Sequence, residues 1–386
     1  EVNKLYVNTT NNRTYIWSGL AYVEVSPSLG GAGDPSVMAT VSRVSDIGEY
    51  FGSAGTIILA LEGGTNYRYT LTDKAIPTTA SSVEYIPVNS GHPMYTATKK
   101  WKLALTSNID SNLFLNGAST LNQTTQVIDL AKLIKNVLTS FNSATVNIAS
   151  GLYYVGEQEF AGAMGLGYAF KPKDLFVFDG TNKNWSITIN GNGAKFKYVD
   201  GLKHGSYDPV TGKVYPKPVP EGKLHTDLNY LATMGEFFSF LHFDSVAIND
   251  VYLDGNAQNC LVGGKWGDYD WQCDQVGFIG RWCKNVSLKN VHCDNFALDG
   301  FVVSNREIQD NDVTYLFNME GCTARNNARQ GMSYVGGNHP TNVNLEGTQG
   351  DIIFNEAPNV GEPFAWSCTT SGSSGSAIWR PLANIS

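Results

Sequence analysis

The chain has 386 residues, a formal net charge of −8 and 40 glycines, and only 16% of its residues are charged. Abundant glycine with low charge is more typical of a repetitive β-protein than of a helical one. The acidic balance argues against a nucleic-acid partner, because no cluster of Lys and Arg is present to neutralise phosphates. No apolar run reaches the roughly 18 residues of a membrane span, so we expect no membrane insertion.

The six cysteines lack the paired spacing of a zinc site. We therefore expect free thiols and assembly in a reducing compartment. The sequence also has no phosphate-binding loop, no cluster of metal ligands and no Ser/His/Asp signature, so we expect neither a metal nor a cofactor.

The first 124 residues divide into two regions. Residues 1–34 predict two short strands around an Asn-Asn turn and then a third strand, a neck or linker segment too small to bury a core. Residues 35–124 predict a mixed α/β region. Its elements are a short helix near 40–50 and strands within 55–63 and 93–105.

The clearest helix is predicted over residues 125–141, where apolar residues recur at helical spacing. A strand is predicted to follow within 145–156, with Val146 and Ile148 pointing inward. A helix directly before the first turn of a solenoid is suited to capping its open end.

Four short segments share one pattern, in which polar and apolar residues alternate and then give way to turn residues: 186–193, 250–257, 290–297 and 319–326. Strict alternation followed by a turn, repeated along the chain, predicts a solenoid of short parallel strands over residues 125–342. We expect the following side chains to occupy the same phase of successive coils: Ile189, Leu253, Cys293 and Cys322.

Three insertions lengthen these coils, at about 200–232, 264–278 and 304–313. Insertions at one phase of a solenoid project from one face, which is often the binding face. After the coils, residues 343–386 read as a small separate β module, for trimerisation or glycan contact, with short strands between Gly, Pro and Ser turns.

Several segments resemble parts of bacteriophage tailspikes, proteins that degrade polysaccharide on the host surface. YVNTTNNRTYIWSGLAYVEVSPS is similar to their neck, and TQVIDLAKLIKNVLTSFNSATVNIASGLYYVG to the entry into a pectate-lyase-like β-helix. LDGNAQNCLVGGKWGD, FALDGF and RQGMSYVGG resemble coils of tailspike depolymerases. GDIIFNEAPNVGEPFAWSCTTSG resembles a small C-terminal module of phage spikes.

The resemblance implies a mainly β fold, a right-handed parallel β-helix that assembles as a homotrimer. It implies binding and cleavage of bacterial capsular polysaccharide or exopolysaccharide. The protein would be made in the host cytoplasm, reside in the virion tail and act at the bacterial cell surface. Attachment to the phage tail or baseplate would use an N-terminal domain missing from this sequence.

The second and third insertions carry the carboxylates expected to perform the chemistry. We predict Asp268, Asp299 and Glu307 as catalytic residues of a glycoside hydrolase, because glycoside hydrolysis needs a pair of carboxyl groups. Asp254 and Asp299 both stand in Leu-Asp-Gly, where a turn can use an Asp side chain to satisfy the backbone. The structural role therefore remains open for Asp299.

Aromatic and polar residues around these acids are suited to holding a sugar chain. The residues predicted to bind substrate are Trp266, Asp270, Trp271, Gln272, Arg306, Tyr334 and His204. Two alternatives remain open. One is a polysaccharide lyase, whose base could come from the first insertion, and the other is a receptor-binding spike that does not cleave.

Overall fold

The computed structural model describes residues 5–8, 13–17, 22–24, 37–50, 57–62, 65–90, 98–160, 168–215, 230–264, 273–304, 316–335, 342–345, 352–355, 365–370 and 378–381. Side chains are described for those between 40 and 333, apart from 62, 65 and 66. The chain forms two compact units, Glu1–Leu105 and Thr106–Ser386. The boundary at 124/125 expected from the helix therefore falls inside the second unit.

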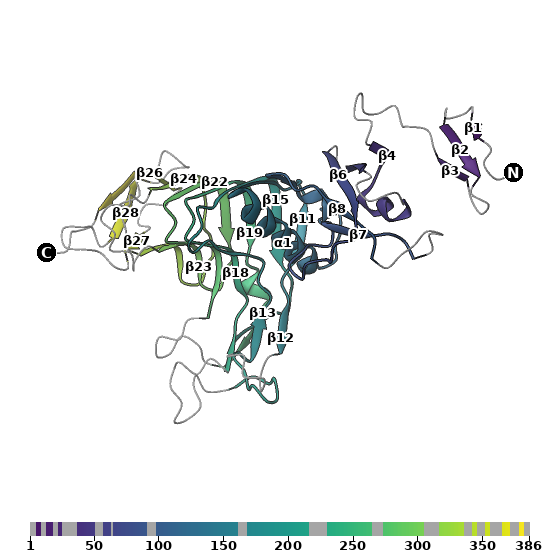
Figure 1. The fold of residues 1–386 in the computed structure, drawn as a ribbon. Helices are drawn as coiled ribbons and strands as arrows, with labels where there is room; N and C mark the ends of the chain where they lie inside the picture. Colours follow the sequence, from purple (N-terminus) through teal and green to yellow (C-terminus); the bar gives the residue numbers. More distant parts are fainter. Residues whose placement is uncertain are drawn as a thin grey trace. The chain divides into compact units, whose positions relative to one another are not determined.

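The first unit contains two small sheets (Figure 1). The three strands predicted within 1–34 are present and pair antiparallel: β1 (Leu5–Asn8), β2 (Arg13–Trp17) and β3 (Tyr22–Glu24). The other sheet has the order β4-β5-β6-β8-β7, with β4 (Val37–Val41), β5 (Ile57–Glu62), β6 (Thr65–Thr72), β7 (Tyr85–Pro87) and β8 (Lys100–Leu103). The helix expected near 40–50 is a 3-10 helix, Val44–Glu49.

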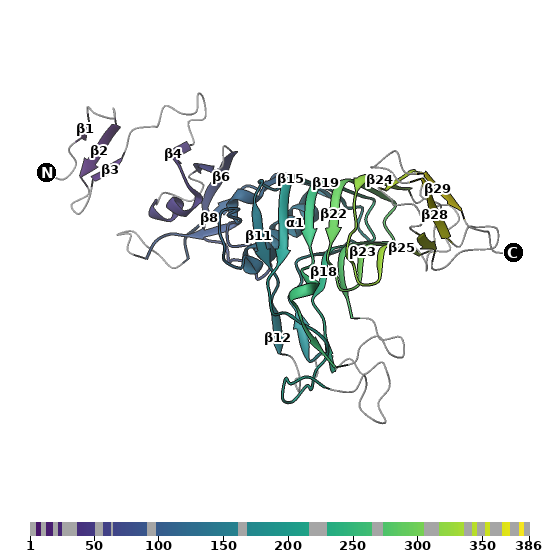
Figure 2. The ribbon, with the colours of Figure 1, turned by 180° about the vertical axis from the view of Figure 1, so that it is seen from behind.

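The second unit is built on two long sheets whose strands are mostly parallel (Figure 2). The first sheet contains β9 (Asn108–Asp110), β10 (Ser143–Asn147), β11 (Leu152–Val155), β15 (Ser186–Tyr198), β19 (Ser245–Asp254), β22 (Asn285–Asp294), β24 (Leu316–Cys322) and β26 (Asn342–Leu345). The second contains β14 (Phe176–Asp179), β18 (Gly235–Leu241), β21 (Gln275–Arg281), β23 (Asp299–Ser304), β25 (Gln330–Val335), β27 (Ile352–Asn355), β28 (Ala365–Thr370) and β29 (Ile378–Pro381).

The chain alternates between these two sheets from β14 to β27, and each return to the same sheet is called a coil here. The predicted helix is present as α1 (Thr124–Phe141), whose buried face includes Leu130, Ile134 and Leu138. It packs against β10, β11 and β14, at one end of the coils. Among the described residues, no helix is both long and apolar enough to cross a membrane.

The inward side chains of the first sheet form two parallel rows, one on each side of a bend in the strands. One row is completely buried and contains Val146, Ile189, Ile248, Leu288 and Met319. The other contains Tyr153, Phe196, Leu253 and Cys293. Each completely buried aliphatic side chain contributes about 1.5–3 kcal/mol by leaving water.

These rows differ from the prediction that Ile189, Leu253, Cys293 and Cys322 occupy equivalent positions in successive coils. All four predicted residues are buried, but only Leu253 and Cys293 are neighbours in one row. Ile189 pairs with Ile248, and Cys322 lies beside Val291, whose carbonyl accepts a hydrogen bond from Thr323 N at 3.1 Å. The prediction was wrong because polar and apolar residues alternate on both sides of the bend, so a match on alternation alone can shift the alignment by a few residues within one strand.

The second sheet carries a continuous row of large side chains across the coils: Phe176, Phe238, Phe278, Phe301 and Met332. The Phe176 and Phe238 rings lie 5.1 Å apart, within the range for favourable aromatic contacts. These side chains fill the space between the two sheets together with those of the first.

A side sheet is attached to the early coils, and Figure 1 shows β12 and β13 projecting from the body. Its strands, in spatial order, are β12 (Gln158–Phe160), β13 (Phe170–Pro172), β17 (Leu231–Ala232), β16 (Lys203–Ser206) and β20 (Leu261–Gly263). Gln158 Nε2 ties the sheet together by donating to the carbonyl oxygens of Lys203 and Thr233, both at 2.7 Å. Strands of the first insertion therefore lie in one sheet with β20, the strand that directly precedes the second insertion.

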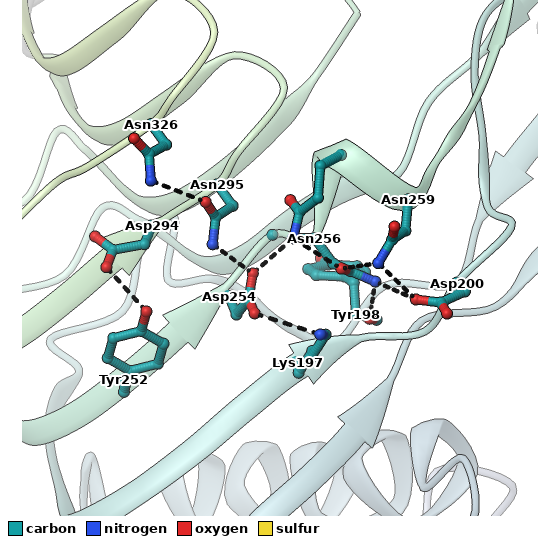
Figure 3. A network of polar contacts seen from close by, with 12 residues as sticks. Lys197, Tyr198, Asp200, Tyr252, Asp254, Asn256, Asn259, Asp294, Asn295 and Asn326 are labelled. Atoms are coloured by element: carbon teal, nitrogen blue, oxygen red, sulfur yellow. Dashed lines mark hydrogen bonds and ion pairs between the residues drawn. The ribbon is translucent and has the colours of Figure 1, made fainter.

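Asparagines occupy the turn that follows the first sheet in three successive coils (Figure 3). Asn256, Asn295 and Asn326 all have positive φ angles, between 52° and 60°, a conformation that asparagine tolerates better than most residues. Asp254 Oδ1 accepts hydrogen bonds from Asn256 N and Asn295 Nδ2, both at 2.9 Å. The structural turn role expected for Asp254 is therefore confirmed.

The C-terminal strands continue the second sheet. β27 pairs with β25 in parallel, and β28 and β29 then add antiparallel strands at the same edge. Residues 343–386 were expected to form a separate module, and instead their described strands extend both long sheets.

The five cysteines whose side chains are described have free thiols, as expected. Cys293 and Cys322 are completely buried. Burial raises the pKa of Cys322 to about 11 and that of Cys293 well above its usual value. Both thiols therefore remain protonated at neutral pH and act as small apolar side chains of the core.

Candidate functional site

Two carboxylates meet where β18 and β21 begin. Glu236 is the second residue of β18, and Asp274 immediately precedes β21. Gly235 pairs with Gln275, and its N–H donates to the carbonyl oxygen of Asp274 at 3.0 Å. A glycine fits at 235 because φ is +79° there and a Cβ would come within 3.0 Å of Pro172. The local backbone thus holds the two acids on adjacent strands.

The surroundings of the two acids differ. The pKa of Asp274 is raised, first because burial disfavours its charged form and then because Glu236 lies nearby, although the residue is reached by solvent. Arg281 and Arg329 act in the opposite direction on the same pKa. Glu236 forms an ion pair with Arg281, with Oε1 3.3 Å from Nη2. One carboxyl is therefore biased toward its protonated form, while its neighbour is paired with a cation.

Two tyrosines lie close to this pair. The pKa of Tyr168 is raised by burial and then by the charges of Asp274, Asp174 and Glu236. Tyr198 is completely enclosed, and its pKa is raised by burial and by Glu236 and Asp174. Its hydroxyl has no hydrogen-bond partner among the described residues. Both phenols stay neutral, so each can donate a hydrogen bond beside the acids.

Asp299 does not join this pair as a reactive group. Its side chain is completely buried and receives Nε and Nη2 of Arg329. The Ser333 hydroxyl donates to it at 2.6 Å, and Gln330 N at 3.2 Å. A carboxylate so enclosed offers no surface to a sugar, which corrects its prediction as a catalytic residue and favours the structural alternative.

His204 is also misplaced as a substrate-binding residue. It lies in β16 with its side chain completely buried, and burial lowers its pKa to about 4. The imidazole is therefore neutral at physiological pH and cannot contact a polysaccharide. The reason is that its strand lies inside the side sheet, whereas the sequence suggested an exposed loop.

Most of the predicted site lies outside the described residues. These residues are Trp266, Asp268, Asp270, Trp271, Gln272, Arg306 and Glu307. Tyr334 is placed only by its backbone, in β25, where it pairs with Val303 and Asn355. Their roles remain predictions.

The third insertion does not leave the coil at the same position as the second, although the sequence pattern predicts that it does. The second insertion leads from β20 of the side sheet into the start of β21, and the third leads from the end of β23 back to β24. Arg281, the last residue of β21, pairs with Ser304, the last of β23. The attachment points of the two insertions are therefore separated by the length of a strand, roughly 20 Å for seven residues. An acid pair shared between them loses its geometric basis.

The sequence contained a signal for Glu236 that the repeat pattern did not use. Glu236 is the only charged residue in MGEFFSFL, a segment otherwise rich in large apolar residues. An isolated carboxylate at the start of a buried strand indicates either a specific ion pair or a functional acid. Tyr168 gave no comparable signal, because its proximity to Glu236 depends on the side sheet.

Comparisons with solved structures give matches that include two tailspike proteins. No protein-family model and no curated protein matches the chain. The enzymatically active domain of tailspike protein 2 from bacteriophage CBA120 is 10% identical, with a TM-score of 0.23, over 77% of this chain and 52% of that one. Full-length tailspike protein 2 from the Escherichia coli O157:H7 bacteriophage CAB120 is also 10% identical, with a TM-score of 0.23, over 86% of this chain and 52% of that one. The chain spans about half the length of these two structures.

Proposed function

We propose that this chain is part of a phage tailspike that binds bacterial capsular polysaccharide or exopolysaccharide and cleaves it by glycoside hydrolysis. The observation that carries the proposal is the position of Glu236 and Asp274 on adjacent strands, where burial and the charge of Glu236 raise the pKa of Asp274, as suits a general acid. The coils of parallel strands and the resemblance of the neck, coil and C-terminal segments support the tailspike role.

In this mechanism Asp274 donates its proton to the glycosidic oxygen as the C–O bond breaks. Glu236 acts on the opposite side of the sugar, either as the base that takes a proton from the attacking water or as the nucleophile. A separation of about 5–5.5 Å between the two carboxyl groups corresponds to retention, and about 6.5–9.5 Å to inversion. Arg281 forms an ion pair with Glu236, and the Tyr168 hydroxyl is proposed to hold the substrate.

The second insertion supplies the remaining parts of the proposed site. It contains Asp274, so Trp266 and Trp271 stand near this acid in the sequence and are proposed to stack on sugar rings. Asp268, Asp270 and Gln272 belong to the same insertion and are proposed to contact the substrate. Glu307 and Arg306, in the third insertion, are proposed to contact a more distant part of the chain, because their insertion begins at the other end of the second sheet.

The same proposal includes the assembly of the chain into a trimeric spike. The two parallel sheets would be faces of a right-handed β-helix, three copies of which form the spike. The spike would reside in the virion tail and act at the bacterial cell surface, with its connection to the tail made by an N-terminal domain.

We favour hydrolysis over β-elimination because of the two acids and because one candidate base of a lyase is buried. A lyase needs a base to remove the proton beside a uronate carboxylate. His204, the described histidine of the first insertion, is buried and neutral, and no substrate can reach it. An acid pair with one raised pKa, in contrast, meets the requirement of a glycosidase.

The test compares Glu236→Gln and Asp274→Asn with the wild-type chain on a panel of purified capsular polysaccharides. Each variant is expected to lose at least about 100-fold in the rate at which reducing ends appear, since general acid–base groups contribute about 10²–10⁴-fold. Glu320→Gln is the matched control, because Glu320 is a half-exposed acid on the first sheet, paired with Lys289 at 3.1 Å.

Three outcomes would contradict the proposal. Full activity in both variants would remove the acid pair from the chemistry. Ultraviolet absorbance from an unsaturated uronate product would show a lyase. Binding of a polysaccharide with no cleavage by the wild-type chain would show a spike that only binds.

A further inference from the structure

The outer face of the first sheet carries a second group of chemically active side chains, away from the acid pair. Lys195, Tyr252, His292 and Thr323 occupy paired positions on four successive coils. They alternate with inward residues such as Phe196, so they point outward. We call these four residues the outer row. At the strand spacing of about 4.8 Å, the outer row spans about 14 Å.

Contacts within the outer row join it into one surface. The Nζ atom of Lys195 lies 5.9 Å from the centre of the Tyr252 ring. The rings of Tyr252 and His292 are 5.9 Å apart and inclined by 36°. His292 Nδ1 lies 2.8 Å from Thr323 Oγ1, a hydrogen bond that fixes the orientation of the imidazole.

A neighbouring row of charged residues, two positions further along each strand, holds the tyrosine in place (Figure 3). The Tyr252 hydroxyl donates to Asp294 Oδ2 at 2.9 Å, and Arg325 N donates to Asp294 Oδ1 at 2.9 Å. Lys197 Nζ lies 3.8 Å from Asp254 Oδ2. Both carboxylates are therefore occupied by protein donors, and the ring orientation is set before any ligand arrives.

Lys195 is, like Arg325 in the neighbouring row, an exposed cation of this surface. Its neighbour in the second row, Lys197, faces Asp254, whereas Lys195 forms no ion pair with any described residue. Half-buried aromatic rings beside an exposed ammonium match the two parts of an acidic sugar. The C–H face of the sugar can pack on the rings, and its carboxylate can approach the cation.

We propose that the outer row is a non-catalytic binding site for uronate-containing segments of a polysaccharide. This inference depends on the proposed function for the class of ligand, and it adds a site on the other sheet from the acid pair. A binding role fits better than a catalytic one, because burial and Asp294 raise the pKa of Tyr252 to about 12. A phenol with such a pKa does not take part as a base at neutral pH.

The test uses the catalytically impaired Asp274→Asn chain, so that binding is measured without cleavage. A panel of purified capsular polysaccharides is immobilised, each in its native form and in a form whose uronate carboxyl groups have been reduced to alcohols. The Asp274→Asn chain is expected to bind at least one native polysaccharide, and to bind its reduced form at least about tenfold more weakly.

Substitutions in the same background then locate the site. Lys195→Ala and Tyr252→Ala are each expected to weaken binding to the native form at least about tenfold, and Lys195→Ala should abolish the difference between the native and reduced forms. Lys289→Ala is the matched control, a half-exposed lysine on another part of the first sheet. Tyr252→Phe keeps the ring and separates loss of stacking from loss of the bond to Asp294.

Unchanged binding in Lys195→Ala and Tyr252→Ala would overturn the inference, as would equal binding of the native and reduced forms. Failure of the Asp274→Asn chain to bind any member of the panel would overturn it as well. These outcomes are distinct from failure of the proposed function, which is shown by the wild-type chain cleaving no member of the panel.

Discussion

At the scale of single residues, the carboxylates of the second sheet fall into two kinds. Asp299 is enclosed and matched by the Arg329 guanidinium, with further donors from Ser333 and Gln330. Asp274 has no such complement of donors in the described structure, and its charged form is disfavoured by burial and by Glu236. The first arrangement stabilises the fold, whereas the second is the one that we propose for proton transfer.

Asp299→Asn should therefore behave as a stability variant. It leaves Arg329 facing an amide, and we expect the free energy of unfolding to fall by about 3 kcal/mol, the low end for a broken buried pair, because Arg329 keeps 29% of its side chain exposed. Denaturant unfolding followed by circular dichroism measures the change. Loss of cleavage in a variant that unfolds like the wild type would instead restore a catalytic role for Asp299.

Asp274→Asn should give the opposite result for stability. The pKa of Asp274 is raised on folding, so the ionised carboxylate destabilises the folded state. This destabilisation is fully present above the pKa of the folded state. It disappears as the pH falls below the pKa of the unfolded state. We therefore expect Asp274→Asn to raise the melting temperature at neutral pH, with a difference that shrinks at acid pH. A lower melting temperature at neutral pH would contradict the pKa direction.

At the scale of elements, the asparagine turns explain how each coil leaves the first sheet. Asn256 is buried, with Nδ2 donating to Tyr198 O and Asp200 Oδ1, both at 2.8 Å. Its positive φ disfavours residues with a bulkier or apolar side chain. The turn therefore requires both the backbone conformation and the amide.

Replacement of Asn256 separates these two contributions. Asn256→Ala should lower the free energy of unfolding by about 2–4 kcal/mol, through lost hydrogen bonds and an unfavourable backbone conformation. Asn256→Gly keeps the conformation and should cost about 1–2 kcal/mol less. Chemical denaturation compares the two, and equal losses would show that the positive φ contributes nothing.

The elements also show how far sequence alone could predict the structure. Helix α1, the three N-terminal strands and the inward alternation were all predictable, because each depends on local periodicity. The row to which Ile189 belongs was not, because the alternation before the bend is identical to that after it. The third insertion was assigned to the wrong turn because it follows β23 of the second sheet, whereas the strand before the second insertion, β20, belongs to the side sheet.

The candidate site was only partly predictable. The sequence indicates a site in the second insertion, which is rich in acids and aromatics and contains Asp274. Glu236 comes from the preceding coil, and its proximity to Asp274 follows from the pairing of Gly235 with Gln275. The sequence spacing predicts neither the pairing of these strands nor the arginines near the two acids, because insertions of different length separate the strands.

At the scale of the whole molecule, the C-terminal strands cover the last edge of the second sheet. β27 to β29 extend the second sheet, so their removal would leave β25 as an unpaired edge. An exposed edge strand is prone to irregular association. We propose that residues 343–386 also hold the three copies of a spike together.

Truncation of residues 343–386 tests this role. The shortened chain should lose the trimer and show aggregation or a lower mass by light scattering coupled to size-exclusion chromatography. The full-length chain, measured at the same concentration, is the control. An unchanged trimer mass after truncation would place the assembly contacts elsewhere.

Mass spectrometry of the digestion products formed in heavy-oxygen water tests the proposed hydrolysis most directly. Hydrolysis by Asp274 and Glu236 predicts one heavy oxygen at each new reducing end with the wild-type chain, and almost no product with Asp274→Asn or Glu236→Gln. Products that carry an unsaturated sugar and no heavy oxygen, or labelled products formed equally fast by both variants, would contradict it.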